Sequence, residues 1–112
     1  MTIREQIIQY KDKLSSKKEL TPEDASKILV ELTAIWGNVN SNLIDAQMDF
    51  NKIKLKYLDE GTSVAKAEIK AQISDEYKWY QEVKGYSELV KEMIRGLKYY
   101  LRACQDELNN YQ

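Results

Sequence analysis

The sequence contains no histidine and a single cysteine, Cys104. An intramolecular disulfide is therefore excluded, as is a zinc site built from Cys and His ligands. The commonest general base and the base of a Ser-His-Asp triad are missing as well. No Gly-rich phosphate-binding motif occurs. We therefore expect a protein without enzymatic activity, and we expect neither a metal, a cofactor nor a small-molecule substrate.

Glycine and proline are also scarce, with four Gly and one Pro among 112 residues. Sheet proteins need many turns, and these two residues build most of them. Charged residues make up 31% of the chain and hydrophobic residues 43%, a balance typical of a folded, helix-rich protein. The length suits one domain. We therefore predict an all-α fold in which residues 1–112 form a single helical domain.

Long apolar runs are absent. The longest uncharged stretch, residues 32–44, is too short and too polar to span a bilayer. The first fourteen residues are charged throughout and lack the apolar segment of a signal peptide. These features predict a cytoplasmic protein that does not interact with membranes.

Helix signals divide the chain into segments. Thr2 and Glu5 fit a capping box, and Thr21 followed by Pro22 is a strong helix start. Ser74 can cap a restart of the last helix, which is the alternative to a continuous one. We predict helices over about 2–18, 22–59, 63–73 and 75–110. The expected architecture is a short N-terminal helix beside a long antiparallel, coiled-coil-like helical hairpin.

Two places can interrupt the long helices. Residues 37–42 combine Gly37 with three Asn and a Ser, all poor residues for a helix interior. Residues 73–75 carry the second N-cap signal. A kink at either place is an alternative to a straight helix, although the apolar pattern continues through 37–42 and favours continuity there.

Apolar residues follow one face of each long helix at alternating spacings of three and four. A helix over 22–60 would be about 58 Å long, whereas a compact chain of this size has a radius of gyration near 13 Å. We therefore expect an elongated hairpin that forms a homo-oligomer to cover the remaining apolar surface. The predicted self-association seam comprises Leu29, Leu32, Trp36, Val39, Leu43, Phe50, Ile53, Val90, Met93 and Leu97.

The last helix also carries a basic face about a third of a turn from its apolar seam. Six basic and three acidic residues lie between positions 78 and 102. This face can contact a nucleic-acid backbone, with tyrosines stacking on bases. It can equally bind an acidic protein surface, or simply face solvent. The residues concerned are Lys84, Lys91, Arg95, Lys98 and Arg102, with Tyr77 and Tyr80 at one end.

The stretch from Leu43 to Leu108 has a recognisable order. A long helix leads into "GTSVAKAE" (61–68), a short Ala-rich helix, a polar break and a long terminal helix with Lys, Arg and Tyr clusters. It resembles small all-helical proteins of unassigned function encoded by bacteriophages and prophages, often near recombination and replication genes. The resemblance implies a bacterial cytoplasm and a context in DNA metabolism, and it assigns no functional residues.

Three functional hypotheses follow. The first is a non-enzymatic module that self-assembles and binds an unknown protein partner, as an accessory of phage DNA metabolism. The second is a DNA-binding protein that uses the basic and tyrosine residues of the last helix. The third is a small inhibitor of a host enzyme, although the acidic residues are dispersed rather than clustered.

Overall fold

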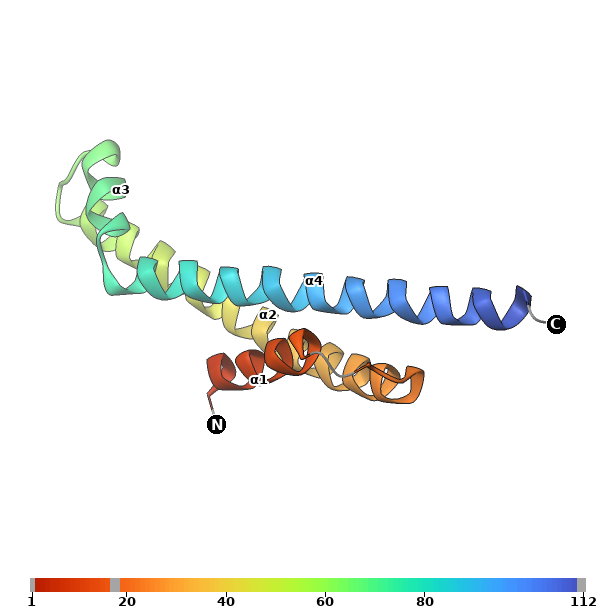
Figure 1. Cartoon of the computed structure of the whole chain (residues 1–112). Coiled ribbons are helices and arrows are strands. Elements are labelled where there is room, and N and C mark those ends of the chain that lie inside the picture. Colours follow the sequence, from red (N-terminus) through yellow and green to blue (C-terminus); the bar gives the residue numbers. More distant parts are fainter. Residues whose placement is uncertain (1, 17–18, 111–112) are drawn as a thin grey trace. The chain divides into compact units, whose positions relative to one another are not determined.

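A computed structural model describes residues 2–16 and 19–110 of the chain. It contains the helices α1 (Ile3–Ser15), α2 (Pro22–Asp59), α3 (Val64–Gln72) and α4 (Asp75–Asn110) (Figure 1). No strand occurs among these described residues. The predicted all-α fold is confirmed. The predicted first helix ran to residue 18, whereas α1 ends at Ser15 and Ser16 has an extended backbone. Lys17 and Lys18 lie outside the described residues.

Side-chain caps set the helix starts as the sequence predicts. Thr21 Oγ1 accepts a hydrogen bond from the backbone N–H of Asp24 at 3.1 Å, at the start of α2. Ser74 Oγ accepts one from the N–H of Tyr77 at 3.2 Å. Each bond satisfies one of the free N–H groups at a helix start. Because Ser74 caps α4, α3 and α4 are separate helices rather than one.

Gly61 ends α2 in the left-handed conformation, with φ of 87°. Its N–H donates to the carbonyl of Leu58, and the N–H of Thr62 donates to the carbonyl of Tyr57. This pair of bonds satisfies carbonyls that the helix leaves free at its C-terminal end. The observed end of α2 agrees with the predicted helix over 22–59. Further back, α2 is helical throughout residues 37–42, and a bend there stays a prediction.

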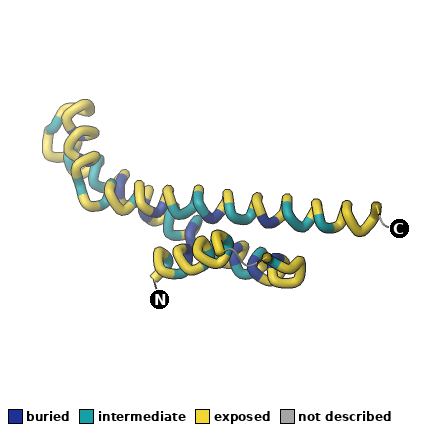
Figure 2. Tube along the Cα trace, in the orientation of Figure 1, coloured by how far each residue is buried: buried dark blue, intermediate teal, exposed yellow. Residues whose placement is uncertain are grey.

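The chain divides into two compact units. Unit 1 comprises residues 1–37 and 88–112, and unit 2 comprises residues 38–87. In unit 1, the hydroxyl of Tyr10 on α1 donates to Glu31 Oε2 on α2 at 2.6 Å. The hydroxyl of Tyr100 on α4 donates to the backbone carbonyl of Leu20. The buried residues of this unit are Ile7, Ala25, Ile28, Leu32, Val90 and Leu97. Figure 2 shows buried positions in dark blue.

Unit 2 joins the second part of α2, α3 and the first part of α4. The ring of Phe50 lies 5.0 Å from that of Tyr77 and 5.8 Å from that of Tyr80, between ring centroids. Ser87 Oγ donates to Asn40 Oδ1 at 2.8 Å. These contacts pair α2 with α4 as a helical hairpin. The buried residues of the unit are Val39, Ala46, Phe50, Ala67, Ala71 and Val83.

The predicted self-association seam takes part in this internal packing. Five of its members are buried within a single copy of the chain: Leu32, Val39, Phe50, Val90 and Leu97. The other five are half-buried: Leu29, Trp36, Leu43, Ile53 and Met93. Because one chain already covers most of this seam, it leaves little apolar area for a second copy. Self-association itself stays a prediction.

Candidate ligand groove

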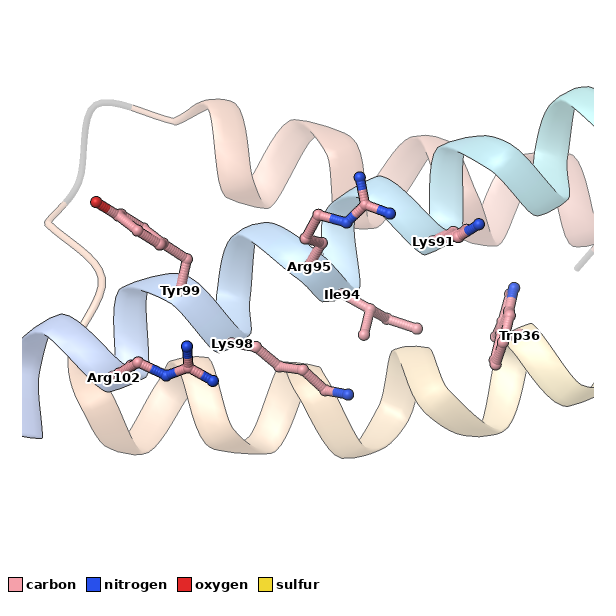
Figure 3. Close-up of a pocket in the computed structure, with 7 residues that line it drawn as sticks. All are labelled: Trp36, Lys91, Ile94, Arg95, Lys98, Tyr99 and Arg102. Carbon is pink, nitrogen blue, oxygen red and sulfur yellow. The ribbon is translucent and has the colours of Figure 1, made fainter.

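Unit 1 contains a groove of about 390 Å³ that combines basic and aromatic side chains. Trp36 comes from α2, and all the other lining residues come from α4 (Figure 3). We call this site the basic groove. Its lining residues are Trp36, Lys91, Ile94, Arg95, Lys98, Tyr99 and Arg102.

The spacing of the basic residues explains why they share one face. Positions 91, 95, 98 and 102 are separated by four, three and four residues, which keeps them within about 60° around a helix. Ile94 lies at one edge of this arc, toward the buried Val90 and Leu97. Tyr99 lies at the opposite edge and is 76% exposed. The basic face therefore has an apolar border beside the core and an aromatic border toward solvent.

Trp36 supplies the apolar wall opposite α4. Figure 3 shows its indole and the side chain of Ile94 pointing toward one another from the two helices. The indole Nε1 is buried and has no hydrogen-bond acceptor among the described residues. A buried donor without an acceptor reduces stability by about 1–3 kcal/mol. This side chain is therefore held in place by its apolar contacts rather than by a hydrogen bond.

The charges of the basic groove are largely uncompensated. Arg95 Nη1 lies 3.1 Å from Glu92 Oε1, and both side chains are well exposed. An exposed pair of this kind contributes about 0–1 kcal/mol, so Arg95 remains able to exchange partners. Within residues 2–16 and 19–110, no carboxylate lies in ion-pair distance of Lys91, Lys98 or Arg102. The groove therefore presents positive charge around an apolar centre.

The structure brings four of the seven predicted binding residues together in this groove: Lys91, Arg95, Lys98 and Arg102. The other three belong to unit 2. Tyr77 and Tyr80 are half-buried with their rings against Phe50, and Lys84 is exposed outside the groove. The tyrosine that lines the groove with the basic residues is Tyr99 instead.

Trp36, Ile94 and Tyr99 line the groove but are not among the predicted binding residues. Trp36 follows the apolar spacing and belongs to the predicted self-association seam. A signal for Ile94 and Tyr99 is present in the sequence. Each is three or four residues from two of the basic positions and so lies beside them on a helix. Trp36 had no such signal, since it comes from another helix.

Other chemistry is not apparent in the described part of the chain. It contains no group of three or more His, Cys, Asp or Glu side chains able to hold a metal ion. None of its helices is both long enough and apolar enough to cross a membrane. The single thiol, Cys104, is half-buried and unpaired.

Comparison with protein-family models, with curated proteins and with solved structures finds no match to this chain. The resemblance to small phage-encoded helical proteins, and the bacterial context that it implies, therefore stay predictions. The basic groove is the feature on which a functional proposal can be built.

Proposed function

We propose that this protein is a non-enzymatic binding module whose basic groove holds an acidic amphipathic segment of another protein. The observation that supports this proposal is the combination of four basic side chains with the apolar surfaces of Trp36 and Ile94. A complementary segment carries one or two apolar anchor side chains flanked by Asp or Glu. Anchors of this kind, enclosed by a polar rim, provide most of the binding energy at protein interfaces.

The charge arrangement favours such a segment. Lysine and arginine at the rim attract carboxylates and accelerate association. Arginine can also hold a carboxylate through two parallel hydrogen bonds, and the groove contains Arg95 and Arg102. Exchange of the exposed Glu92 for a ligand carboxylate on Arg95 has a small energetic cost, because the existing pair is solvent-screened.

Single-stranded nucleic acid is the second candidate ligand, and the exposure of Tyr99 is the observation that favours it. A tyrosine that is 76% exposed beside arginines can stack on a base. Two features argue for the protein ligand instead. The whole chain has a net charge of −1, whereas proteins that bind nucleic acid through many phosphate contacts are usually basic. The wall formed by Trp36 and Ile94 is also half-buried, which suits a side chain better than a base.

Tryptophan fluorescence can test the proposal directly. The chain has two tryptophans, so the Trp79→Phe variant leaves Trp36 in the groove as the only reporter. This variant is titrated with two probes at about 50 mM salt, because phosphate contacts are strong at low salt. The first is a helical peptide with two leucines one turn apart among glutamates. The second is a single-stranded oligothymidine of matched charge.

We expect the peptide to quench the Trp36 fluorescence saturably or to shift it to the blue. The oligonucleotide should give a much weaker response. The reverse order supports the nucleic-acid candidate and contradicts the protein ligand. A response to neither probe overturns both assignments of the groove. A peptide of the same length and charge, with its leucines replaced by serine, serves as the control for charge alone.

A further inference from the structure

Unit 2 carries a row of exposed apolar residues on α2. The four apolar residues, Ile44, Met48, Leu55 and Leu58, are 61%, 53%, 57% and 37% exposed. Asn51, also exposed, lies in the middle. We call these five residues the outer stripe. It differs from the predicted self-association seam and shares no residue with it.

The outer stripe has the spacing of a coiled-coil seam. Its positions alternate separations of four and three residues over two heptads, so they occupy the a and d positions of a heptad repeat. On the helix they lie about 80–180° from the buried residues Ala46 and Phe50, at 100° per residue. Helix α2 therefore has two apolar faces, and only one of them packs inside the chain.

Exposed apolar residues are common one at a time, but a continuous row of them is not. Such a row on a helix is typical of a surface that another helix covers. The polar Asn51 in the centre is consistent with this, because one polar residue in a coiled-coil seam commonly fixes register and partner number.

The charges beside the outer stripe differ along α2. Asp45 and Asp49 lie near its beginning, Lys52 and Lys56 lie in its second half, and Asp59 follows its last residue. Each pair is four residues apart, a spacing at which like charges destabilise a helix by about 0.2–0.5 kcal/mol. None of the four forms an ion pair within the described residues. By contrast, Lys54 is used internally, with its Nζ 4.3 Å from the centroid of the Phe50 ring.

We propose that the outer stripe is covered by the same stripe of a second copy of this chain, running in the opposite direction. The antiparallel orientation places the acidic half of one helix against the basic half of the other, twice by symmetry. In the register that faces a positions with d positions, Ile44 meets Leu55 of the second copy. Asp45 then lies beside Lys52 of the second copy, at the flanking positions that set orientation in coiled coils.

The outer stripe is short, and its length limits the affinity. From residue 44 to residue 58 it extends roughly 21 Å along the helix axis. A contact of this length buries less area than the about 800 Å² that each partner of a standard interface buries. We therefore expect a reversible dimer with a dissociation constant of tens of micromolar. The dimer forms and dissociates with concentration rather than being permanent.

Sedimentation equilibrium of the full chain, from about 5 to 500 µM so as to bracket that constant, tests the proposal. The chain is expected to shift from monomer to dimer over this range. Leu55→Glu places a charge in the seam and is expected to weaken dimerisation by more than about tenfold. Leu108→Glu, on α4, is the matched control because Leu108 is similarly exposed at 65%. It is expected to leave the dimer unchanged.

A charge exchange tests the antiparallel orientation. Asp45→Lys and Lys52→Asp each place like charges side by side in the dimer, and each is expected to weaken it about tenfold. The double variant exchanges the two charges and is expected to restore the original affinity. Far-UV circular dichroism should show the same helix content in every variant, because all the changed side chains are exposed.

A chain that stays monomeric up to about 500 µM, well above the expected constant, overturns the proposal. So does a dimer that persists unchanged in Leu55→Glu. If the double charge exchange fails to restore affinity, the antiparallel register is wrong. None of these results bears on the basic groove, since the four changed residues lie outside it. The two proposals therefore fail independently.

Discussion

The two ends of α4 contain the same kinds of residue in different surroundings. In unit 2, Tyr77 and Tyr80 pack their rings on Phe50, and Lys54 lies over the same ring. In unit 1, Tyr99 is 76% exposed, and the basic residues around it line a groove. Tyrosines of α4 thus pack against Phe50 in unit 2, whereas Tyr99 lies with the basic residues on the open surface of unit 1.

The difference teaches that tyrosines and lysines near each other in a sequence do not by themselves predict a binding surface. What matters is the residue that α2 places opposite them. Phe50 gives the unit 2 tyrosines an apolar partner, so they become part of the packing. In unit 1, Trp36 lies opposite the basic face and faces Ile94. The charged ends of the lysine and arginine side chains remain in solvent. The following predictions test this contrast, beginning with the largest effect.

Phe50→Ala is expected to destabilise the protein by about 3–4 kcal/mol, because it removes a buried ring and leaves a cavity. Tyr99→Ala is expected to change stability by less than about 0.5 kcal/mol, since Tyr99 is exposed. Urea unfolding followed by circular dichroism measures both. Phe50→Leu keeps most of the volume and should cost less than about 1.5 kcal/mol. Similar losses for Phe50→Ala and Tyr99→Ala would contradict the contrast between the units.

Charge reversal of the groove is expected to affect binding rather than folding. The double variant Lys91→Glu/Lys98→Glu should weaken binding of the acidic peptide by about 30-fold or more, because two attractive charges become repulsive. Lys84→Glu changes the same type of exposed residue in unit 2 and should alter affinity less than about twofold. Fluorescence titration of Trp36 measures all three proteins. If Lys84→Glu weakened peptide binding as much as the double variant does, the basic groove would not be the binding site.

Tyr10 should make unit 1 sensitive to alkaline pH. Its hydrogen bond to Glu31, together with partial burial, raises the pKa of Tyr10 from 10.0 to about 12. A raised tyrosine pKa stabilises the folded protein below pH 10, and this contribution is lost as the pH rises toward about 12. After allowance for solvent screening, Tyr10→Phe should cost about 1 kcal/mol at neutral pH.

The difference in unfolding free energy between the natural chain and Tyr10→Phe should shrink toward zero between pH 10 and pH 12. Both proteins contain the same lysines, so their titration cancels in the comparison. A difference in unfolding free energy that stays constant across this range would show that folding does not raise the pKa of Tyr10.

Two glycine substitutions should have opposite signs and the smallest effects. Gly61→Ala forces a side chain into a positive φ of 87° and should destabilise the end of α2 by about 1 kcal/mol. Gly96 lies inside α4 with open space where a Cβ would be, so Gly96→Ala should stabilise the helix by about 0.5–1 kcal/mol. Thermal unfolding distinguishes them, and shifts of the same sign would contradict the assigned backbone conformations.

Local signals in the sequence were sufficient to predict the helices. Thr21 with Pro22, Ser74 and Gly61 mark boundaries because capping depends on residues within three or four positions of each other. The grouping of Lys91, Arg95, Lys98 and Arg102 was predictable for the same reason, since helical spacing alone puts them on one face. Lys84 also fits that spacing, yet it lies outside the groove.

The sequence by itself thus determined an all-α chain, the starts of its helices and the basic face of α4, because each depends on neighbours along one helix. Only the tertiary structure decided which apolar face of α2 became the core, and it buried Phe50 while leaving Leu55 exposed. It also brought Trp36 to the basic residues and took Tyr77 and Tyr80 into the packing of unit 2. These outcomes depend on contacts between helices, which periodicity along a single helix does not specify.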